Sequence, residues 1–148
     1  MIAVVQRVVY GAVLVDEQII SEIGVGMVVL VSVHAKDEVG DVEWMAGKLA
    51  GLRIFRNGDK YFDADVKQCG GSVLLVSNFT VAAETAKGRR PSLSPAAGPD
   101  KGRELFDKLV AAVRAQGVQV ETGRFQAEMR VDIANDGPVT FIVDSREK

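Results

Sequence analysis

The sequence predicts a single α/β domain, residues 1–148, in which mixed β-sheets form a barrel-like arrangement with two helices on one side. Many short apolar runs rich in β-branched residues are separated by turn residues, which is typical of strands. Only two segments space their apolar residues as helices do. The chain contains 47% hydrophobic and 26% charged residues, which are ordinary values for a folded domain.

The first third of the chain is expected to consist of strands. Residues 2–9, 12–15 and 19–23 are short β-branched runs, with turns expected at Gly11 and at Asp16-Glu17. Residues 27–33 form a continuous apolar run, which predicts a strand that is buried on both faces.

Two helices are expected, at residues 37–51 and 99–116. In the first, Asp37 or Asp41 is a candidate N-cap. The second begins at Pro99 and stops before Gly117. The other expected elements are strands at 53–55, 72–78, 118–121, 129–134 and 139–143, a turn at Asn57-Gly58 and a loop at 84–99.

Composition excludes several classes of function. One His and one Cys are too few for an ordinary zinc site, so neither a metal nor another cofactor is expected. Gln6 and Arg7 interrupt the apolar N-terminal run, which predicts neither a signal peptide nor a membrane span. Together with the single Cys69, this indicates the cytoplasm. A net charge of −2 argues against coating long nucleic acids but allows binding of a short end.

The hexapeptide from Asn135 to Thr140 is the most unusual segment. Asn-Asp-Gly between two apolar runs predicts a hairpin turn. Pro138 has no N–H, so the return strand would lack a ladder bond and the tip would present free carbonyls. Arg7, inside an apolar strand, needs acceptors, and carbonyls near Pro138 would suit it.

A candidate reaction centre is Ser77-Asn78-Phe79-Thr80, at the end of an apolar strand. The commoner interpretation of such a cluster is turn capping. A nucleophilic hydroxyl needs a positioned base, and the only His, His34, ends another strand. The chain therefore lacks an evident acid–base set. An enzyme built from it would place backbone dipoles around an oxyanion and leave proton transfer to substrate or water.

Two further segments have both a functional and a structural interpretation. The basic loop from Lys87 to Ser92 is either a solvated loop or a phosphate grip of limited size. The segment from Thr122 to Phe125, followed by Ala127 and Met129, is either core or a flat apolar slot for a nucleobase.

Along essentially its whole length, the chain resembles the bacterial D-aminoacyl-tRNA deacylases. The family motifs Ser-Gln-Phe-Thr and Asn-x-Gly-Pro-Val-Thr match residues 77–80 and 135–140. Residues 70–74, 90–92 and 122–125 also resemble family segments. One departure is Asn78, where the family usually has the longer Gln.

The resemblance implies a homodimer with a three-layer fold of the family's own type. It implies hydrolysis of the ester that joins a D-amino acid, or glycine mischarged on tRNA-Ala, to the tRNA 3′ end. Gly137 and Pro138 would form a chiral gate, with a cis peptide bond, that enters the partner's site and is anchored by Arg7. The first motif would line the reaction centre with Ser77, Asn78, Phe79 and Thr80. The terminal adenosine would lie against Phe125, Ala127 and Met129.

Three alternatives remain open at this point. The first is an editing module that removes a wrong L-amino acid from tRNA, as in archaeal threonyl-tRNA synthetases. The second is a dimer that binds RNA ends without catalysis. The third is an unrelated hydrolase that uses Ser77 or Thr80 with His34.

Overall fold

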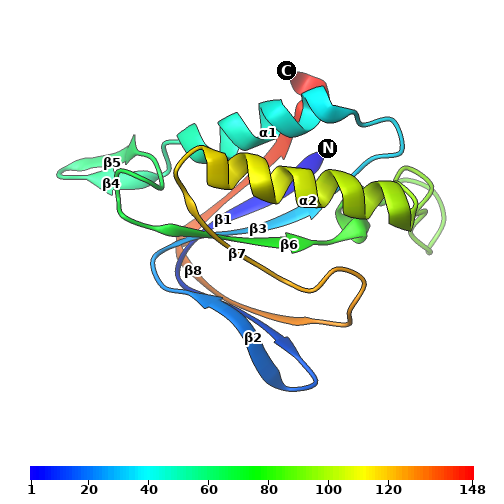
Figure 1. Cartoon of the computed structure of the whole chain (residues 1–148), viewed down its shortest axis with the longest axis horizontal. Coiled ribbons are helices and arrows are strands. Elements are labelled where there is room, and N and C mark those ends of the chain that lie inside the picture. Colours follow the sequence, from blue (N-terminus) through cyan, green and yellow to red (C-terminus); the bar gives the residue numbers. More distant parts are fainter.

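The computed structural model describes residues 1–148 and contains a strongly bent six-stranded sheet with two helices on one face (Figure 1). The strand order is β2-β1-β3-β6-β7, and β8 pairs with β1. The predicted α/β class and barrel-like sheet are confirmed. The strands of the sheet are β1 (Ile2–Val15), β2 (Gln18–Ile23), β3 (Gly26–Ser32), β6 (Ser72–Ser77), β7 (Gln119–Thr122) and β8 (Arg130–Asp144).

The remaining elements lie around this sheet. Both α1 (Val39–Gly51) and α2 (Pro99–Ala115) cover the same face of it (Figure 1). A separate hairpin is formed by β4 (Phe55–Asn57) and β5 (Lys60–Ala64), close to the expected Asn57-Gly58 turn. Two short 3₁₀ helices are η1 (Phe79–Ala82) and η2 (Ser145–Glu147). No helix is long and apolar enough to cross a membrane.

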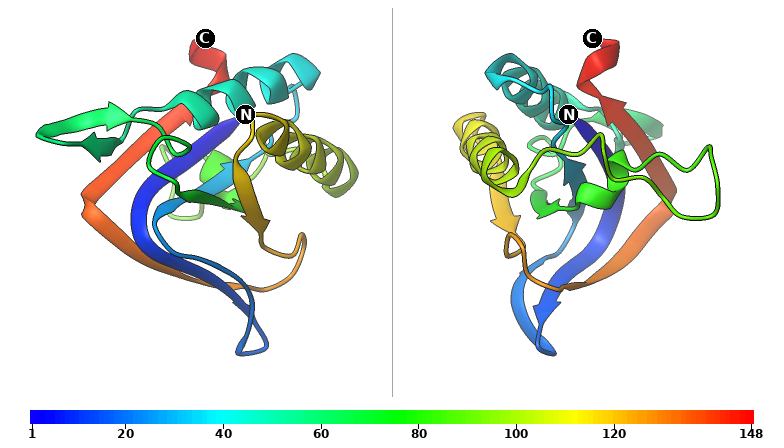
Figure 2. Two further views of the ribbon diagram at one scale, coloured as in Figure 1. Left: turned by 60° about the vertical axis from the view of Figure 1, so that its left-hand side comes forward. Right: turned by 90° about the vertical axis from the view of Figure 1, so that its right-hand side faces the viewer.

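The first strand is longer than the sequence predicts. The two strands expected at 2–9 and 12–15 are one strand, β1, so the predicted turn at Gly11 is wrong. A Cβ at position 11 would lie 2.5 Å from Val28 Cγ2, so glycine is needed here for close packing. The strand bends instead of turning, and it pairs with β3 in its first part, with β2 in its second and with β8 along both (Figure 2).

The two central parallel strands are buried on both faces, as predicted for residues 27–33. In β3, Met27 and Val29 pack under the helices, whereas Val28 packs inside the bend of the sheet. In β6, Leu75 and Val76 divide in the same way. Because side chains alternate along a strand, a continuous apolar run is what two opposed cores require.

The helices begin and end close to their predicted positions. The N-cap of α1 is Glu38, so the prediction of Asp37 or Asp41 at this position is wrong. Asp41 is instead the third residue of the helix, and its carboxylate accepts a hydrogen bond from the Glu38 N–H at 2.9 Å. Asp37 has a different role, because its carboxylate accepts from the Met1 ammonium at 2.5 Å and from the His34 N–H at 2.7 Å. Helix α2 has Pro99 in its first turn and is followed by Gly117, whose φ is +80°.

The segment from Asn135 to Thr140 is not a hairpin, so that prediction is wrong. The two expected strands at 129–134 and 139–143 are parts of one strand, β8, because Asn135 pairs with Val8 and Thr140 pairs with Gln6. Residues 136–139 therefore bulge out opposite Arg7. The Asn135 side chain closes this bulge, accepting from the Val139 N–H at 2.8 Å and donating to Thr140 Oγ1 at 2.9 Å.

The buried His34 predicts a pH dependence of stability. Its Nε2 is buried without a hydrogen-bond partner. Burial, and then the charge of Arg146, lower the pKa of His34 below its usual value of about 6.5. The unfolded chain then binds the proton more readily, so the His34 contribution is complete above about pH 6.5 and is lost as pH falls through the lower folded-state pKa.

Urea titrations on either side of this range test the expectation. Between neutral and mildly acidic pH, His34→Gln should lose less stability than wild type, because glutamine takes up no proton. An equal loss in both proteins would contradict the expectation.

Candidate active site

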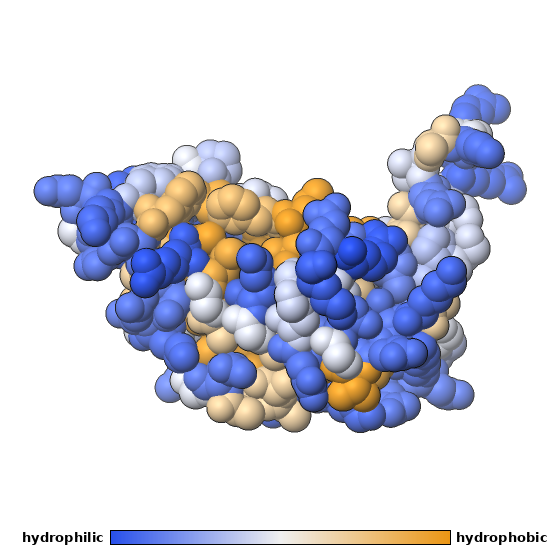
Figure 3. Space-filling model, turned by 90° about the horizontal axis from the view of Figure 1, so that it is seen from above, coloured by the Kyte–Doolittle hydropathy of each residue, from blue (hydrophilic) through white to orange (hydrophobic).

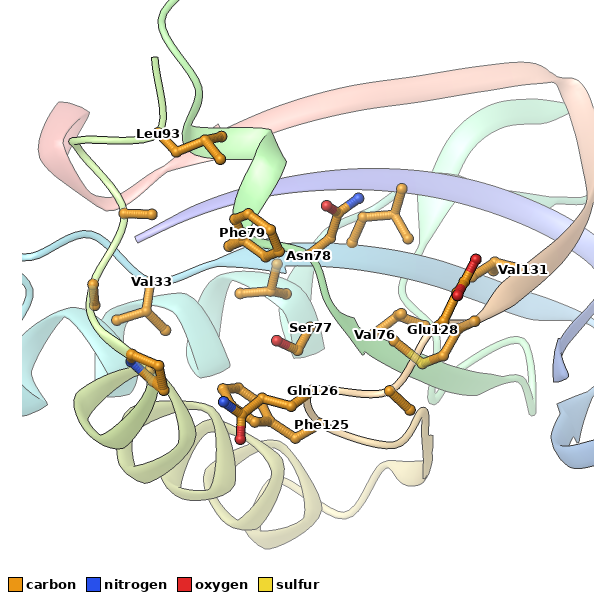
Figure 4. A pocket seen from close by; sticks show the side chains of 18 of the residues that line it. Val33, Val76, Ser77, Asn78, Phe79, Leu93, Phe125, Gln126, Glu128 and Val131 are labelled. Atoms are coloured by element: carbon orange, nitrogen blue, oxygen red, sulfur yellow. The ribbon is translucent and has the colours of Figure 1, made fainter. Parts of the chain in front are cut away.

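A cavity of about 880 Å³ opens at the carboxyl ends of the parallel strands β3 and β6. A site at such strand ends is expected in α/β folds, and this volume lies in the range of ligand pockets, roughly 300–1,000 Å³. Its walls come from β3, the β6–η1 junction, the loop before α2 and the loop before β8. Lining residues drawn in Figure 4 include Val33, Ser77, Phe79, Leu93, Phe125 and Glu128.

The β6–η1 junction holds the first predicted motif. The Asn78 N–H donates to the Val31 carbonyl at 2.8 Å, which continues the pairing of β6 with β3. The Asn78 Oδ1 accepts from the Thr80 N–H at 3.2 Å and from Thr80 Oγ1 at 2.5 Å. Asn78 therefore caps its own turn and fixes Thr80, and its short side chain suits this local contact.

Phe79 begins η1 at the edge of the cavity. As the first residue of the helix, its N–H has no partner inside η1. Its carbonyl accepts from Ser32 Oγ at 3.3 Å, which ties η1 to β3. The Phe79 side chain is exposed. Figure 4 shows Ser77 in the space between the Phe79 and Phe125 rings.

The facing wall is the loop between β7 and β8, which contains the predicted apolar slot. A Cβ at Gly123 would lie 2.8 Å from Met129 Sδ, so glycine allows Met129 to pack closely there. The Phe125 and Phe106 ring centroids are 6.1 Å apart, and the Arg103 guanidinium lies 4.6 Å from the Phe125 centroid. These contacts hold Phe125 in place while it lines the cavity.

The cavity carries little acid–base chemistry. Glu128 is its only ionisable lining residue, and in Figure 4 it lies near Val131, away from Ser77. His34 does not line the cavity, and its Nε2 has no hydrogen-bond partner, Ser77 and Thr80 included. No group of three or more His, Cys, Asp or Glu residues is arranged to hold a metal ion. Near Ser77 the polar groups are its own hydroxyl and the Phe79 N–H, which has no partner inside η1.

Arg7 holds the bulge of β8. Its side chain is only 3% exposed, and it donates from Nη1 to the Ile54 carbonyl at 2.7 Å and from Nη2 to the Tyr61 hydroxyl at 3.2 Å. Its Nε lies 3.3 Å from the Asp136 carbonyl and 3.0 Å from Asp136 Oδ2. Asp136, two residues before Pro138, thus supplies acceptors for Arg7. Because Arg7 also donates to Tyr61, it joins the bulge to β5.

The bulge presents Gly137 and Pro138 to solvent. The peptide bond between them is cis, and Gly137 has a φ of +131°. A Cβ at this position would lie 2.6 Å from Val139 Cγ2 and 3.2 Å from the Tyr61 hydroxyl. Only glycine fits this conformation without displacing its neighbours.

The sequence-predicted site residues fall into two separate groups. One group lines the cavity and consists of Ser77, Asn78, Phe79, Phe125, Ala127 and Met129. The other group lies outside the cavity of its own chain and consists of Arg7, Thr80, Gly137 and Pro138. The cavity of one chain therefore lacks every residue of the second motif.

Sequence reasoning missed part of the cavity wall. Leu93, Ala96 and Gly98, in the loop before α2, line it, as do Gln126 and Glu128. The small residues just before α2 were the available signal, because a close approach of backbone to a ligand favours small side chains. The exposed Gln126 and Glu128 carry no pattern that distinguishes them from ordinary loop residues.

An exposed apolar cluster flanks the bulge. It comprises Tyr61, Phe62, Phe141 and Ile142, which we call the β5–β8 patch. The Phe62 ring centroid lies 4.6 Å from that of Tyr61 and 5.9 Å from that of Phe141, and Ile142 is 72% exposed. The second edge of β8 pairs with no strand of the chain. Figure 3 shows apolar atoms gathered on the surface between two hydrophilic projections.

The chain matches known proteins over nearly its whole length. The family model described as "D-Tyr-tRNA(Tyr) deacylase" matches residues 4–144. A "D-aminoacyl-tRNA deacylase" of Carboxydothermus hydrogenoformans is 50% identical over 96% of this chain and 98% of its own length. One of Pelobacter propionicus is 48% identical over the same shares.

Solved structures agree in fold. A "c-Myc DNA Unwinding Element Binding Protein" has a TM-score of 0.91 at 31% identity, covering 97% of this chain and 98% of its own. A "probable eukaryotic D-amino acid tRNA deacylase" has a TM-score of 0.83 at 17% identity, covering 96% and 97%. The family-model match and the identity to full-length relatives together show that the chain belongs to the D-aminoacyl-tRNA deacylase family of hydrolases.

Proposed function

We propose that the chain hydrolyses the ester bond of D-aminoacyl-tRNA, and of glycine mischarged on tRNA-Ala, to release the amino acid and free tRNA. This is chiral proofreading in translation. Beyond family membership, the observation that carries the proposal is a ligand-sized cavity at a strand end that has the Phe79 N–H at its edge and no acid–base pair in its lining. Such a site suits a substrate that supplies its own proton-transfer group.

The terminal adenosine of tRNA would occupy the wall formed by Phe125, Ala127 and Met129. All three line the cavity, and Phe125 packs against Phe106 and Arg103. Unpaired bases of RNA commonly stack on aromatic side chains. This position would direct the ester on the terminal ribose across the cavity, toward the β6–η1 junction.

The chemistry would use the backbone of η1. Water adds to the ester carbonyl carbon, the bond to the ribose 3′-oxygen breaks, and that oxygen takes up a proton. The Phe79 N–H has no partner inside η1 and can donate to the oxyanion. The free 2′-hydroxyl of the same ribose would orient or activate the water. Thr80 as a covalent nucleophile ranks second, because no base accompanies its hydroxyl, which Asn78 already binds.

The gate would be formed by Gly137 and Pro138 of a second subunit in a homodimer. Both residues are exposed and lie outside the cavity of their own chain. The β5–β8 patch beside them offers the apolar surface that a subunit interface needs. Arg7 would hold the gate rigid through Asp136.

Main-chain carbonyls suit the task of reading chirality. They test only the geometry at Cα, so D-amino acids with different side chains can enter. An L side chain would meet the gate and be excluded, and specificity by exclusion needs no contact to the accepted side chain. Glycine has no side chain to exclude, so glycyl-tRNA is expected to be cleaved as well.

The alternatives from the sequence give different results in the same assays. An L-specific editing module would cleave L-seryl-tRNA, and a non-catalytic binder of RNA ends would bind aminoacylated tRNA without turnover. A hydrolase that uses His34 has no support from the geometry, since His34 does not line the cavity.

The chirality of the substrate is the first test. Purified protein should hydrolyse D-tyrosyl-tRNA and glycyl-tRNA on the order of 100-fold or more faster than L-tyrosyl-tRNA, because the gate excludes the L side chain. Gly137→Ala, whose Cβ would press on Val139 and displace the gate, should reduce this ratio. Release of radiolabelled amino acid measures both. Equal rates of wild type on D- and L-tyrosyl-tRNA would refute the proposal.

The source of the proton transfer is the second test. A D-aminoacyl-tRNA with a 2′-deoxy terminal adenosine should react about 100-fold more slowly or worse, the usual range for losing an acid–base group. Thr80→Ala and Glu128→Gln should each keep rates within about tenfold of wild type, because neither side chain transfers the proton. Single-turnover rates report the chemical step. Full activity of wild type on the deoxy substrate would contradict substrate assistance. Loss of activity of Glu128→Gln on the normal substrate would contradict it as well.

The oligomeric state is the third test. Ile142→Asp places a charge in the β5–β8 patch and should convert a dimer into a monomer, with loss of deacylation. Ile19→Asp is the matched control, since Ile19 is 54% exposed on β2, outside the patch. Light scattering after gel filtration gives the mass. A monomeric wild-type protein with full activity would rule out a gate supplied by a second subunit.

A further inference from the structure

A basic arm, residues 84–92, projects from the body beside the cavity (right-hand view of Figure 2). At its base, Glu84 and Ser92 exchange two backbone hydrogen bonds of 2.9 Å each. All residues between them are exposed. In Figure 3 the arm stands clear of the body as a hydrophilic projection. Its base is therefore fixed while its tip extends into solvent.

The tip of the arm concentrates positive charge. Lys87, Arg89 and Arg90 are exposed, and none of them takes part in a salt bridge. The only acidic residue of the arm is Glu84, at its base. The whole chain has a net charge of −2, so this patch opposes the sign of the molecule. Adjacent cations without carboxylate partners are suited to phosphate groups.

The arm starts at the mouth of the cavity. The chain that follows it supplies Leu93, Ala96 and Gly98 to the cavity wall. This chain is fixed to the body, because the Ala97 N–H donates to the Val33 carbonyl at 2.8 Å and the Pro95 carbonyl accepts from the Ala35 N–H at 3.0 Å. A polymer that leaves the cavity on this side therefore passes the arm.

The reach of the arm suits a distance of two or three nucleotides. Because Glu84 pairs with Ser92, the arm is a closed loop and each cation is two or three residues from this pair, which corresponds to about 7–10 Å of extended chain. One strand of a nucleic-acid helix carries a phosphate about every 3.4 Å along its axis. With the terminal adenosine in the cavity, the cations would meet phosphates upstream of the terminal nucleotide.

We propose that the basic arm binds the phosphate backbone of the tRNA acceptor end upstream of the terminal nucleotide. Phosphate contacts position a nucleic acid without reading its sequence, so the arm would serve tRNAs of different identity equally. The proposal rests on the proposed function only for the placement of adenosine in the cavity. RNA binding itself requires no hydrolysis and can be measured alone.

The test compares two triple variants of equal charge. One changes Lys87, Arg89 and Arg90 to Ala, and the other changes the exposed residues Lys48, Arg53 and Lys67 to Ala. The control residues lie in or after α1 and around β4–β5, at the opposite side of Figure 1 from the arm. Any general effect of net charge is therefore the same in both.

Binding is measured with an RNA that contains the acceptor stem and CCA end of a tRNA and carries no amino acid. Fluorescence anisotropy at a series of salt concentrations gives the slope of log affinity against log salt. Each lost phosphate contact lowers the size of this slope by about 0.7–0.9, so the arm variant should lose about 2 and the control much less. Equal slopes in the two variants would overturn the proposal.

Rates of hydrolysis on two substrates distinguish the role of the arm from that of the catalytic site. For D-tyrosyl-tRNA, the arm variant should show KM raised about tenfold or more with little change in kcat, because lost phosphate contacts weaken binding. For D-tyrosyl-adenosine, which has no upstream phosphates, both variants should match wild type.

Two other outcomes have separate meanings. A loss of activity on D-tyrosyl-adenosine with conversion to monomer would assign the arm to the subunit interface and refute RNA binding. If wild type cleaves neither ester, the proposed function fails, whereas the salt slopes still decide the role of the arm.

Discussion

The buried guanidinium of Arg7 is the contact on which the arrangement of β8 depends. A charged side chain that is almost fully buried must have acceptors, and Arg7 takes them from Ile54, Tyr61 and Asp136. These acceptors belong to the segment before β4, to β5 and to the bulge of β8. One side chain therefore joins three parts of the chain that are distant in sequence. Because the bulge lies directly opposite Arg7, its shape follows from satisfying that charge.

The cavity follows from a second constraint, the burial of β3 and β6 on both faces. Two opposed cores fix the parallel strands so that their carboxyl ends open at one edge. The chain leaving β6 turns at once into η1, and the Asn78 side chain sets that turn. A main-chain amide at the start of a helix is then available without any reactive side chain nearby. The chemistry of the site thus resides in backbone geometry, which explains why few ionisable residues surround it.

Periodicity and turn residues predicted much of this structure. The continuous apolar runs of β3 and β6 and the Pro99 and Gly117 boundaries of α2 are local signals, and all agree with the structure. The hairpin predicted at residues 135–140 is wrong because Asn, Asp and Gly favour a bulge as readily as a turn. Which of the two forms is decided by pairing with β1, a strand far away in sequence. The turn predicted at Gly11 is wrong for the same reason, since the Val28 side chain that requires a glycine there comes from another strand. In the loop before α2 only the small residues were a signal in the sequence. Its contribution to the cavity wall therefore became evident only from the tertiary structure.

The bulge also affects what the free edge of β8 can do. An unpaired strand edge with exposed apolar side chains is a template onto which any extended chain can add, and this is how open-ended aggregation begins. In β8 the ladder is interrupted between Asn135 and Thr140, and Pro138 contributes no N–H. The edge is therefore divided into two short segments, and neither is long and flat. A feature suited to presenting carbonyls thereby also limits uncontrolled strand addition, so the chain can keep Phe141 and Ile142 exposed for a specific partner.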